Sequence, residues 1–163
     1  MSTTSRDRRT PAELEVLVEQ PRFSFVKRRD DGSVDFVSPL PCPFNYGSVP
    51  DTRAADGDRE DAIVLGPRLP KGTRLRLPVQ GRVHFIDAGV YDGKWVCGHG
   101  IRAADRRALV WFFRAYTLAK RARSWWRQSG GPTQFLGLEL EDVHGAPAPH
   151  AASSPSSDAA TEA

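Results

Sequence analysis

Cysteine is scarce in this 163-residue chain, which contains only Cys42 and Cys97. Two cysteines are too few for a disulfide scaffold, so the fold must rest on a hydrophobic core. The sequence also lacks any run of about 18 apolar residues, which excludes a membrane-spanning helix. It shows no secretory apolar segment either. These absences make a reducing, cytoplasmic location the default expectation.

An excess of one charge is also missing. The formal net charge is only +3, with 39% hydrophobic and 26% charged residues, a composition typical of a globular protein. This mild basicity permits an anionic substrate or nucleic acid without requiring either. The length suits one domain with a real core.

The two ends of the chain differ from its middle. Residues 1–10 are polar and basic, and we expect a flexible arm there. Residues 146–163 are rich in Ala, Pro and Ser with little to bury, which predicts a disordered tail. The folded domain is therefore expected over residues 11–145.

The apolar pattern of the middle segment favours short strands. Strands are predicted at residues 14–19, 23–27, 33–37, 62–65, 74–79, 81–87, 94–98 and 135–143. Asp31-Gly32 predicts a hairpin turn between the second and third of them. One long helix is predicted over 105–126, closed by Gly130-Gly131. Many strands with one long helix, and a second short helix left open, indicate a mainly β (α+β) small closed barrel.

The stretch "DGDREDAIVL" crowds Asp56, Asp58, Glu60 and Asp61 together before an apolar strand. Such carboxylates repel one another unless water screens them or a cation lies between them. An EF-hand is excluded, because its loop needs Gly at the sixth position and Glu at the twelfth. A solvated turn and a Mg²⁺ site both remain, since Gly57 would let the flanking carboxylates converge.

A second acidic stretch, "IDAGVYDGKW", contains Asp87, Asp92 and Lys94. Asp92-Gly93 could be no more than a hairpin turn, and Lys94 no more than a salt-bridge partner. Beside a metal, however, the lysine could hold a phosphate oxygen. Upstream, "CPFNYG" supplies Tyr46 before an expected turn at Gly47, with a phenol that could donate to phosphate.

Together these residues resemble the soluble inorganic pyrophosphatases of family I. That family has an Asn-Tyr-Gly element, then Asp-Gly-Asp-x-x-Asp entering an apolar strand, then Asp-x4-Asp-x-Lys; "NYGSVPDTRAADGDREDAIVL" and Asp87, Asp92 and Lys94 match this order. "WFFRAYTLAK" resembles its aromatic helix and "VLVEQP" its metal-side strand. The resemblance covers residues 13–143 and implies an OB-like barrel of the pyrophosphatase type.

The resemblance also implies a chemistry, the Mg²⁺-dependent hydrolysis of pyrophosphate to two phosphates. By matching position it implies metal ligands, a residue acting on the attacking water, and phosphate ligands. These are Asp56, Asp61, Asp87, Asp92 and Glu19 for metal, Asp58 for the water, and Tyr46, Lys94 and Tyr116 for phosphate. Bacterial members are often oligomeric, so a homo-oligomer is also an expectation.

The chain departs from the family in its cations. Ser24, Val26 and Thr117 stand where the family has a lysine, a glutamate and a lysine, and a family arginine has no counterpart in the shortened segment after Gly32. Each lost contact to phosphate weakens transition-state stabilisation. Lys27, Arg28, Arg53 and Lys120 are the candidates to replace them.

Two other functions stay open. A catalytically weakened or regulatory relative would bind metal or phosphate without turnover. A nucleic-acid-binding barrel would use Arg6, Arg8, Arg9 and the stretch "KRARSWWR", although basic residues also suit the C-terminal end of a helix. The four histidines lack ligand spacing, and no role is assigned to them.

Overall fold

The structure is a computed structural model that describes residues 10–28, 33–38, 40–54, 57–127 and 131–141. The elements are β1 (Glu13–Gln20), β2 (Val26–Arg28), β3 (Val34–Val37), β4 (Asn45–Val49), β5 (Glu60–Val64), β6 (Arg74–Asp87), β7 (Val90–Tyr91), β8 (Lys94–Cys97), α1 (Ala103–Arg127) and β9 (Gln134–Leu140). The predicted hairpin turn at 31–32, residues 1–9 of the arm predicted over 1–10, and the tail predicted over 146–163 lie outside the described residues.

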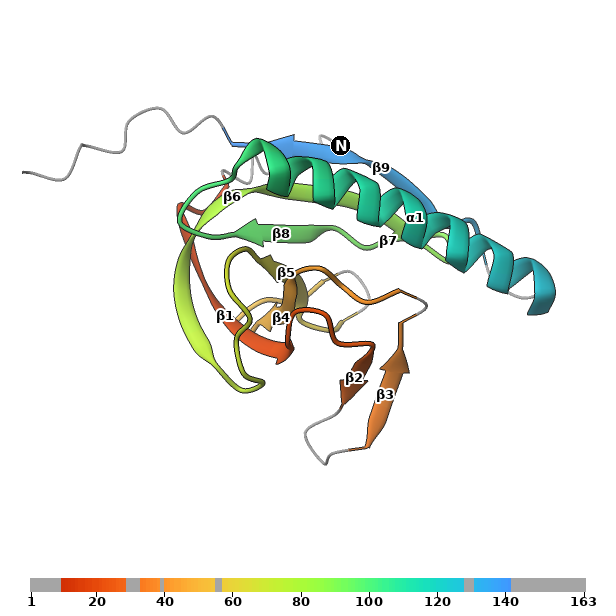
Figure 1. Cartoon of the computed structure of the whole chain (residues 1–163), viewed down its shortest axis with the longest axis horizontal. Helices are drawn as coiled ribbons and strands as arrows, with labels where there is room; N and C mark the ends of the chain where they lie inside the picture. Colours follow the sequence, from red (N-terminus) through yellow and green to blue (C-terminus); the bar gives the residue numbers. More distant parts are fainter. Residues whose placement is uncertain (1–9, 29–32, 39, 55–56, 128–130, 142–163) are drawn as a thin grey trace, which may run out of the picture.

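The strands pair into a closed ring. β1 pairs with β4, β4 with β5, β5 with β8, β8 with β6, and the first half of β6 returns to β1. β7 and β9 extend the second half of β6 (Figure 1). β6 serves both halves because it is long and because its register against β8 shifts between Val79 and Gly81. The prediction of a mainly β, barrel-like fold is confirmed.

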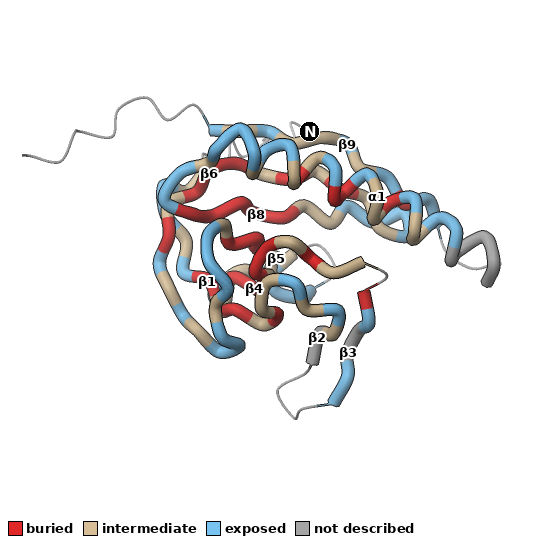
Figure 2. The backbone as a smooth tube through the Cα atoms, in the orientation of Figure 1, coloured by how far each residue is buried: buried red, intermediate tan, exposed pale blue. Residues whose placement is uncertain are grey.

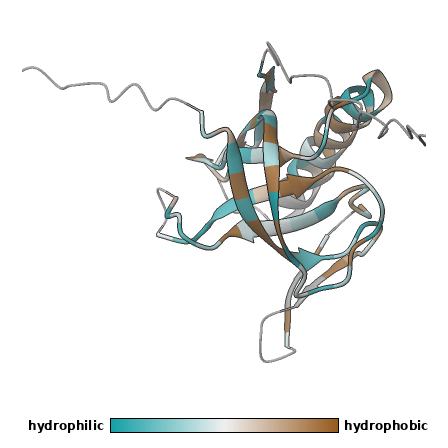
Figure 3. Ribbon diagram, turned by 90° about the vertical axis from the view of Figure 1, so that its left-hand side faces the viewer, coloured by the Kyte–Doolittle hydropathy of each residue, from teal (hydrophilic) through white to brown (hydrophobic). Residues whose placement is uncertain are grey.

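Alternation along the ring strands divides the core in two. Val16, Ala62 and Val64 belong to a cluster built entirely from ring strands. Ile63, Val83 and Val96 pack instead with Phe112 and Phe113 of α1. Successive side chains point to opposite faces of a strand, so neighbours such as Ala62 and Ile63 fall on different sides. Figure 2 shows buried segments along the ring strands, and Figure 3 shows hydrophobic and hydrophilic bands along them.

Helix α1 covers one face of the sheet beside β6, β8 and β9 (Figure 1). Its start is fixed by Asp105, whose carboxylate accepts the backbone N–H of Arg102 at 3.1 Å and the Arg102 guanidinium at 2.9 Å. This satisfies a helix-terminal donor and places negative charge at the positive end of the helix. Among the described residues α1 is the only helix, and it is not apolar enough to cross a membrane.

The hairpin formed by β2 and β3 projects from the ring (Figures 1 and 2). Val34 and Val37 are about half exposed on it. The predicted strand over 23–27 is therefore only partly correct: β2 begins at Val26, because Phe23 adopts a positive φ of 63° that no strand accommodates.

Two turn predictions were wrong. Gly47 lies in the middle of β4, opposite both Val18 and Ala62, where the sequence had suggested a turn. The hairpin turn of the second acidic stretch is Ala88-Gly89, not Asp92-Gly93. Both residues have positive φ, 49° and 87°, as a two-residue hairpin turn with right-handed twist requires. β4 and β7 were not predicted as strands.

Candidate active site

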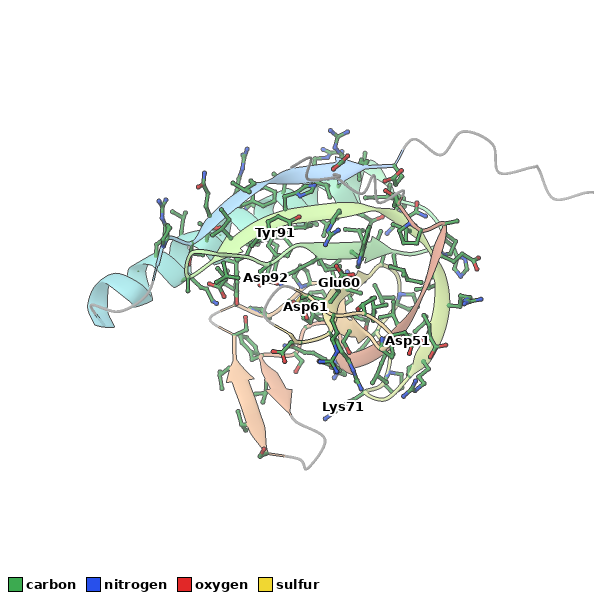
Figure 4. All side chains as sticks on the ribbon, turned by 180° about the vertical axis from the view of Figure 1, so that it is seen from behind. Asp51, Glu60, Asp61, Lys71, Tyr91 and Asp92 are labelled. Atoms are coloured by element: carbon green, nitrogen blue, oxygen red, sulfur yellow. The ribbon has the colours of Figure 1, made fainter. Side chains whose placement is uncertain are left out.

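A cavity of about 260 Å³ is bounded by α1 and by the strands that face it. It collects side chains from β4, β5, β8, the end of β6 and the helix. Seven residues that the sequence had singled out line it: Tyr46, Asp61, Asp87, Asp92, Lys94, Tyr116 and Lys120. Figure 4 shows Asp61 and Asp92 near one another, with Asp51 well away from them.

Strand register explains how Asp61 and Lys94 come to share this cavity. They are direct partners in the parallel pairing of β5 with β8, so their side chains point to the same face. Asp61 is two residues before Ile63, which packs against the helix-side core. The alternation of side chains along β5 thus places the Asp61 carboxylate on the helix side of the sheet.

Lys94 joins two of the acidic residues. Its ammonium donates to Asp61 at 2.7 Å and to Asp92 at 2.8 Å, and its side chain is 6% exposed. Burial alone would lower the pKa of Lys94, but Asp61 and Asp92 more than offset it and raise that pKa above its usual value. Lys94 is therefore charged over the physiological pH range.

Tyr46 adds a neutral donor to the same carboxylate. Its hydroxyl donates to Asp61 Oδ2, and its ring lies beneath the Lys94 ammonium at 5.5 Å. Burial, followed by the charges of Asp61 and Asp92, raises the pKa of the Tyr46 phenol well above its usual value. The phenol accordingly stays protonated and able to donate.

The far side of the cavity carries a second lysine–carboxylate pair. Lys120 of α1 donates to Asp87 Oδ2, and its ammonium lies 5.4 Å from the centre of the Tyr116 ring. Thr133 donates to the other Asp87 oxygen at 3.3 Å. Lys120 lies four residues beyond Tyr116, so both project from the same face of the helix. Of the two candidate replacement cations whose side chains the structure describes, Arg53 and Lys120, Lys120 is the one that lines the cavity.

Aromatic side chains form the apolar wall. Tyr116 stacks on Phe112 with ring centres 5.7 Å apart, and Phe113 packs edge-on against both. Burial, then the charges of Asp87, Asp92 and Asp61, raises the pKa of the Tyr116 phenol. The three carboxylates therefore all act on this hydroxyl, which stays protonated.

Three predicted residues are not shown in the cavity. Glu19 accepts a hydrogen bond from the Ser48 hydroxyl at 2.6 Å and does not line the cavity. Asp58 is exposed on the acidic loop, whose backbone is closed by Ala54 N–H donating to Asp58 O at 2.7 Å. Asp56 lies outside the described residues.

Sequence reasoning did not find three further lining residues, Gln20, Ser38 and Cys42. No feature of a single sequence distinguishes them, because such residues occur equally well in cores and turns. Burial raises the pKa of the Cys42 thiol to about 11, although a backbone hydrogen bond and Lys94 oppose it. At neutral pH Cys42 is a thiol rather than a thiolate, so it is a poor metal ligand or nucleophile.

The donor chemistry of the cavity suits a hard cation. Asp61, Asp87 and Asp92 offer carboxylate oxygens, and no imidazole or thiolate joins them among the described lining residues. As the described side chains stand, no three acidic or metal-binding groups are close enough to form a finished metal site. Lys94 and Lys120 hold these carboxylates, so the residues fit a divalent cation once the lysine pairs open.

Comparison with known proteins places this arrangement in a family. The family model for inorganic pyrophosphatase matches residues 16–109, more than half of the chain. The chain belongs to the inorganic pyrophosphatase family. Inorganic pyrophosphatase from Gluconobacter oxydans is 34% identical over 105 residues, which cover 60% of this chain and 61% of that one. The relative from Saccharolobus solfataricus is 32% identical over 95 residues, covering 53% and 55%.

The chain therefore spans about three fifths or less of the length of these curated relatives. Solved pyrophosphatases share its fold more widely. The structure from Coxiella burnetii has a TM-score of 0.64 at 24% identity, covering 81% of this chain and 88% of that one. The structure from Thermus thermophilus has a TM-score of 0.65 at 22% identity, covering 81% and 84%.

The family resemblance makes the neutral substitutions at Ser24 and Thr117 informative. Thr117 is buried and its hydroxyl donates to Phe113 O at 2.7 Å, inside the helix. The Ser24 hydroxyl is bonded within its own turn to Val26. Neither position offers a cation to the pyrophosphatase cavity. Arg53 is exposed and donates to Gly57 O at 3.1 Å, away from the cavity lining.

Proposed function

We propose that this chain hydrolyses inorganic pyrophosphate to two phosphates with the help of Mg²⁺. The observation that carries the proposal is the single cavity in which Asp61, Asp87 and Asp92 meet Lys94 and Lys120. Carboxylates that hold metal and cations that hold phosphate are the two halves that phosphoryl transfer requires. The family membership supports the same substrate.

The metal half of the proposed site consists of Asp56, Asp61, Asp87 and Asp92, with Glu19 as an outer carboxylate. Bound divalent cations supply Lewis-acid stabilisation of phosphate charge and lower the pKa of bound water. Asp61 is oriented for this by the Tyr46 hydroxyl, and Asp87 by Thr133. Thr133 can stay on Asp87 when Lys120 moves, whereas the Tyr46 hydroxyl has one proton and leaves Asp61 when it donates to phosphate.

The phosphate half consists of Lys94, Tyr46 and Tyr116. Lys94 and the two phenols, all protonated at neutral pH, can donate to phosphate oxygens. A water oxygen attacks one phosphorus, and the bond from that phosphorus to the bridging oxygen breaks. The family resemblance assigns acceptance of the water proton to Asp58, which does not itself line the cavity. Phe112 and Phe113 keep bulk water from the inner wall.

The direct test is phosphate release from pyrophosphate with Mg²⁺ and with EDTA, against tripolyphosphate and nucleoside triphosphates. Asp92→Asn and Asp58→Asn should each lower kcat by at least about a hundredfold, the usual contribution of a positioned acid or base. Asp51→Asn, an exposed acidic residue away from the cavity, is the matched control and should retain activity. Full activity in Asp92→Asn would contradict the proposal.

A weakened or regulatory relative is the second candidate, favoured by the neutral positions at Ser24 and Thr117. Such a protein would bind metal and phosphate in the same cavity without measurable phosphate release. Titration of Mg²⁺ and phosphate by calorimetry, beside the release assay, separates the two. Binding without turnover in the wild type would favour this candidate.

A further inference from the structure

Lys120 is the cavity cation best placed to change partners. Its side chain is 22% exposed, whereas that of Lys94 is 6% exposed. Lys94 forms ion pairs with Asp61 and Asp92 while nearly buried, and Lys120 forms an ion pair with Asp87 while partly exposed. A partly exposed pair is screened by water and contributes much less than a buried one. The flexible four-carbon stem of lysine also lets its ammonium swing without moving the helix.

Asp87 has a second hydrogen-bond donor besides Lys120. Thr133 donates to Asp87 Oδ1, while Lys120 donates to Oδ2. The carboxylate therefore stays oriented toward the cavity when the ammonium leaves. A divalent cation bound to Asp87 would repel the nearby Lys120 ammonium. The metal ion and the ammonium would therefore compete for the same carboxylate.

The negative charge of the substrate provides a new partner for the Lys120 ammonium. Pyrophosphate carries several negative charges, and Lys94 is the other described cation that lines the cavity. Lys120 lies beside the Tyr116 ring and would remain at the cavity wall after leaving Asp87. A charge-assisted hydrogen bond to a phosphate oxygen is a stronger replacement than water.

We propose that Lys120 is a phosphate-binding residue that pairs with Asp87 in the metal-free protein and is transferred to the substrate when a divalent cation takes Asp87. This inference rests on the proposed function. Residue 120 lies beyond the segment that the family model matches. Lys120 thus competes with the metal for Asp87 and, once displaced, strengthens phosphate binding. The binding of metal and the binding of phosphate are therefore coupled.

The coupling makes Lys120→Met act in opposite directions on two ligands. Calorimetry of Mg²⁺ alone should show severalfold tighter binding in the variant, because the competing ammonium is gone. Methylenediphosphonate, titrated at saturating Mg²⁺, should bind at least about tenfold more weakly, as expected for one lost charge-assisted hydrogen bond. Lys120→Arg should retain most of the diphosphonate affinity. Arg121→Met, an exposed neighbour of equal charge, should leave both affinities unchanged.

Unchanged diphosphonate affinity in Lys120→Met would overturn the inference, as would weaker binding of Mg²⁺. A purely structural role would lower both affinities together with the unfolding midpoint, which also overturns it. The proposed function fails separately. Wild type that binds diphosphonate through Lys120 yet releases no phosphate would refute hydrolysis and support this inference. If wild type releases phosphate and Lys120→Met binds diphosphonate as tightly as wild type, hydrolysis would be supported and this inference refuted.

Discussion

The Lys94 ammonium lies 2.7 Å from Asp61 Oδ2, and the two residues are direct partners in neighbouring parallel strands. Backbone register thus places the two side chains on the same face of the sheet, within reach of one another. The same ammonium reaches Asp92, so one buried positive charge keeps two carboxylates close together. This arrangement brings together two of the carboxylates that we propose as metal ligands.

Lys94→Met should destabilise the metal-free protein by about 1–3 kcal/mol, because the Asp61 and Asp92 carboxylates, 22% and 35% exposed, lose a counter-charge that water replaces only in part. Mg²⁺ should restore more stability to this variant than to wild type, since the cation replaces the lost charge. Urea unfolding with Mg²⁺ and with EDTA measures both effects. Lys71→Met, at an exposed lysine, is the control. Equal Mg²⁺ effects in wild type and Lys94→Met would count against metal binding at these carboxylates.

The Lys94 pair should also give stability a dependence on alkaline pH. The folded-state pKa of Lys94 is raised above its ordinary value of 10.5. A raised pKa means that the contribution is fully present below about pH 10.5 and is lost as pH rises through the folded-state pKa. The unfolding free energy of wild type should therefore fall above this pH more steeply than that of Lys94→Met. Parallel pH profiles for the two proteins would contradict the assignment.

Tyr116→Phe should preserve the fold and weaken phosphate binding. The ring contacts with Phe112 and Phe113 survive the substitution, so the unfolding midpoint should barely move. Loss of one hydrogen bond to a charged oxygen should weaken methylenediphosphonate binding by about tenfold. Calorimetry in Mg²⁺ measures this, and an unchanged affinity would exclude the phenol from the phosphate half.

Gly47→Ala should be strongly destabilising, because Gly47 lies within a strand that packs closely against its neighbour. A Cβ at this position would lie 2.1 Å from Leu17 O, part of the backbone of the paired strand β1. Forcing the strands apart should cost about 1–3 kcal/mol or more. Gly57→Ala is the contrast, because its Cβ would meet nothing within 4 Å and only its φ of +91° costs energy. Equal losses of unfolding free energy in the two variants would refute the close-approach explanation.

Asn45 shows a limit of motif reading of a different kind. Within the Asn-Tyr-Gly motif the sequence suggested a phosphate contact for Tyr46, and Tyr46 does line the cavity. Asn45, however, is fully buried and bonds the loop after β5: its amide donates to Pro67 O at 2.8 Å and accepts from Leu69 N–H at 2.8 Å. One residue of the motif thus fixes the scaffold on which its neighbour is displayed.

The sequence by itself determined the strands whose apolar alternation is local, the long helix, and the residue types needed for metal and phosphate. These follow from periodicity and spacing, which act over a few residues. Only the tertiary structure decided that Asp61, Asp87, Asp92 and Lys120 share one cavity, because their meeting depends on pairings between distant strands and on how α1 packs. The tertiary structure also decided that Gly47 lies within a strand and that Ala88-Gly89 forms the hairpin turn. A glycine needed for the close approach of two strands cannot be told from a glycine needed for a turn by sequence alone.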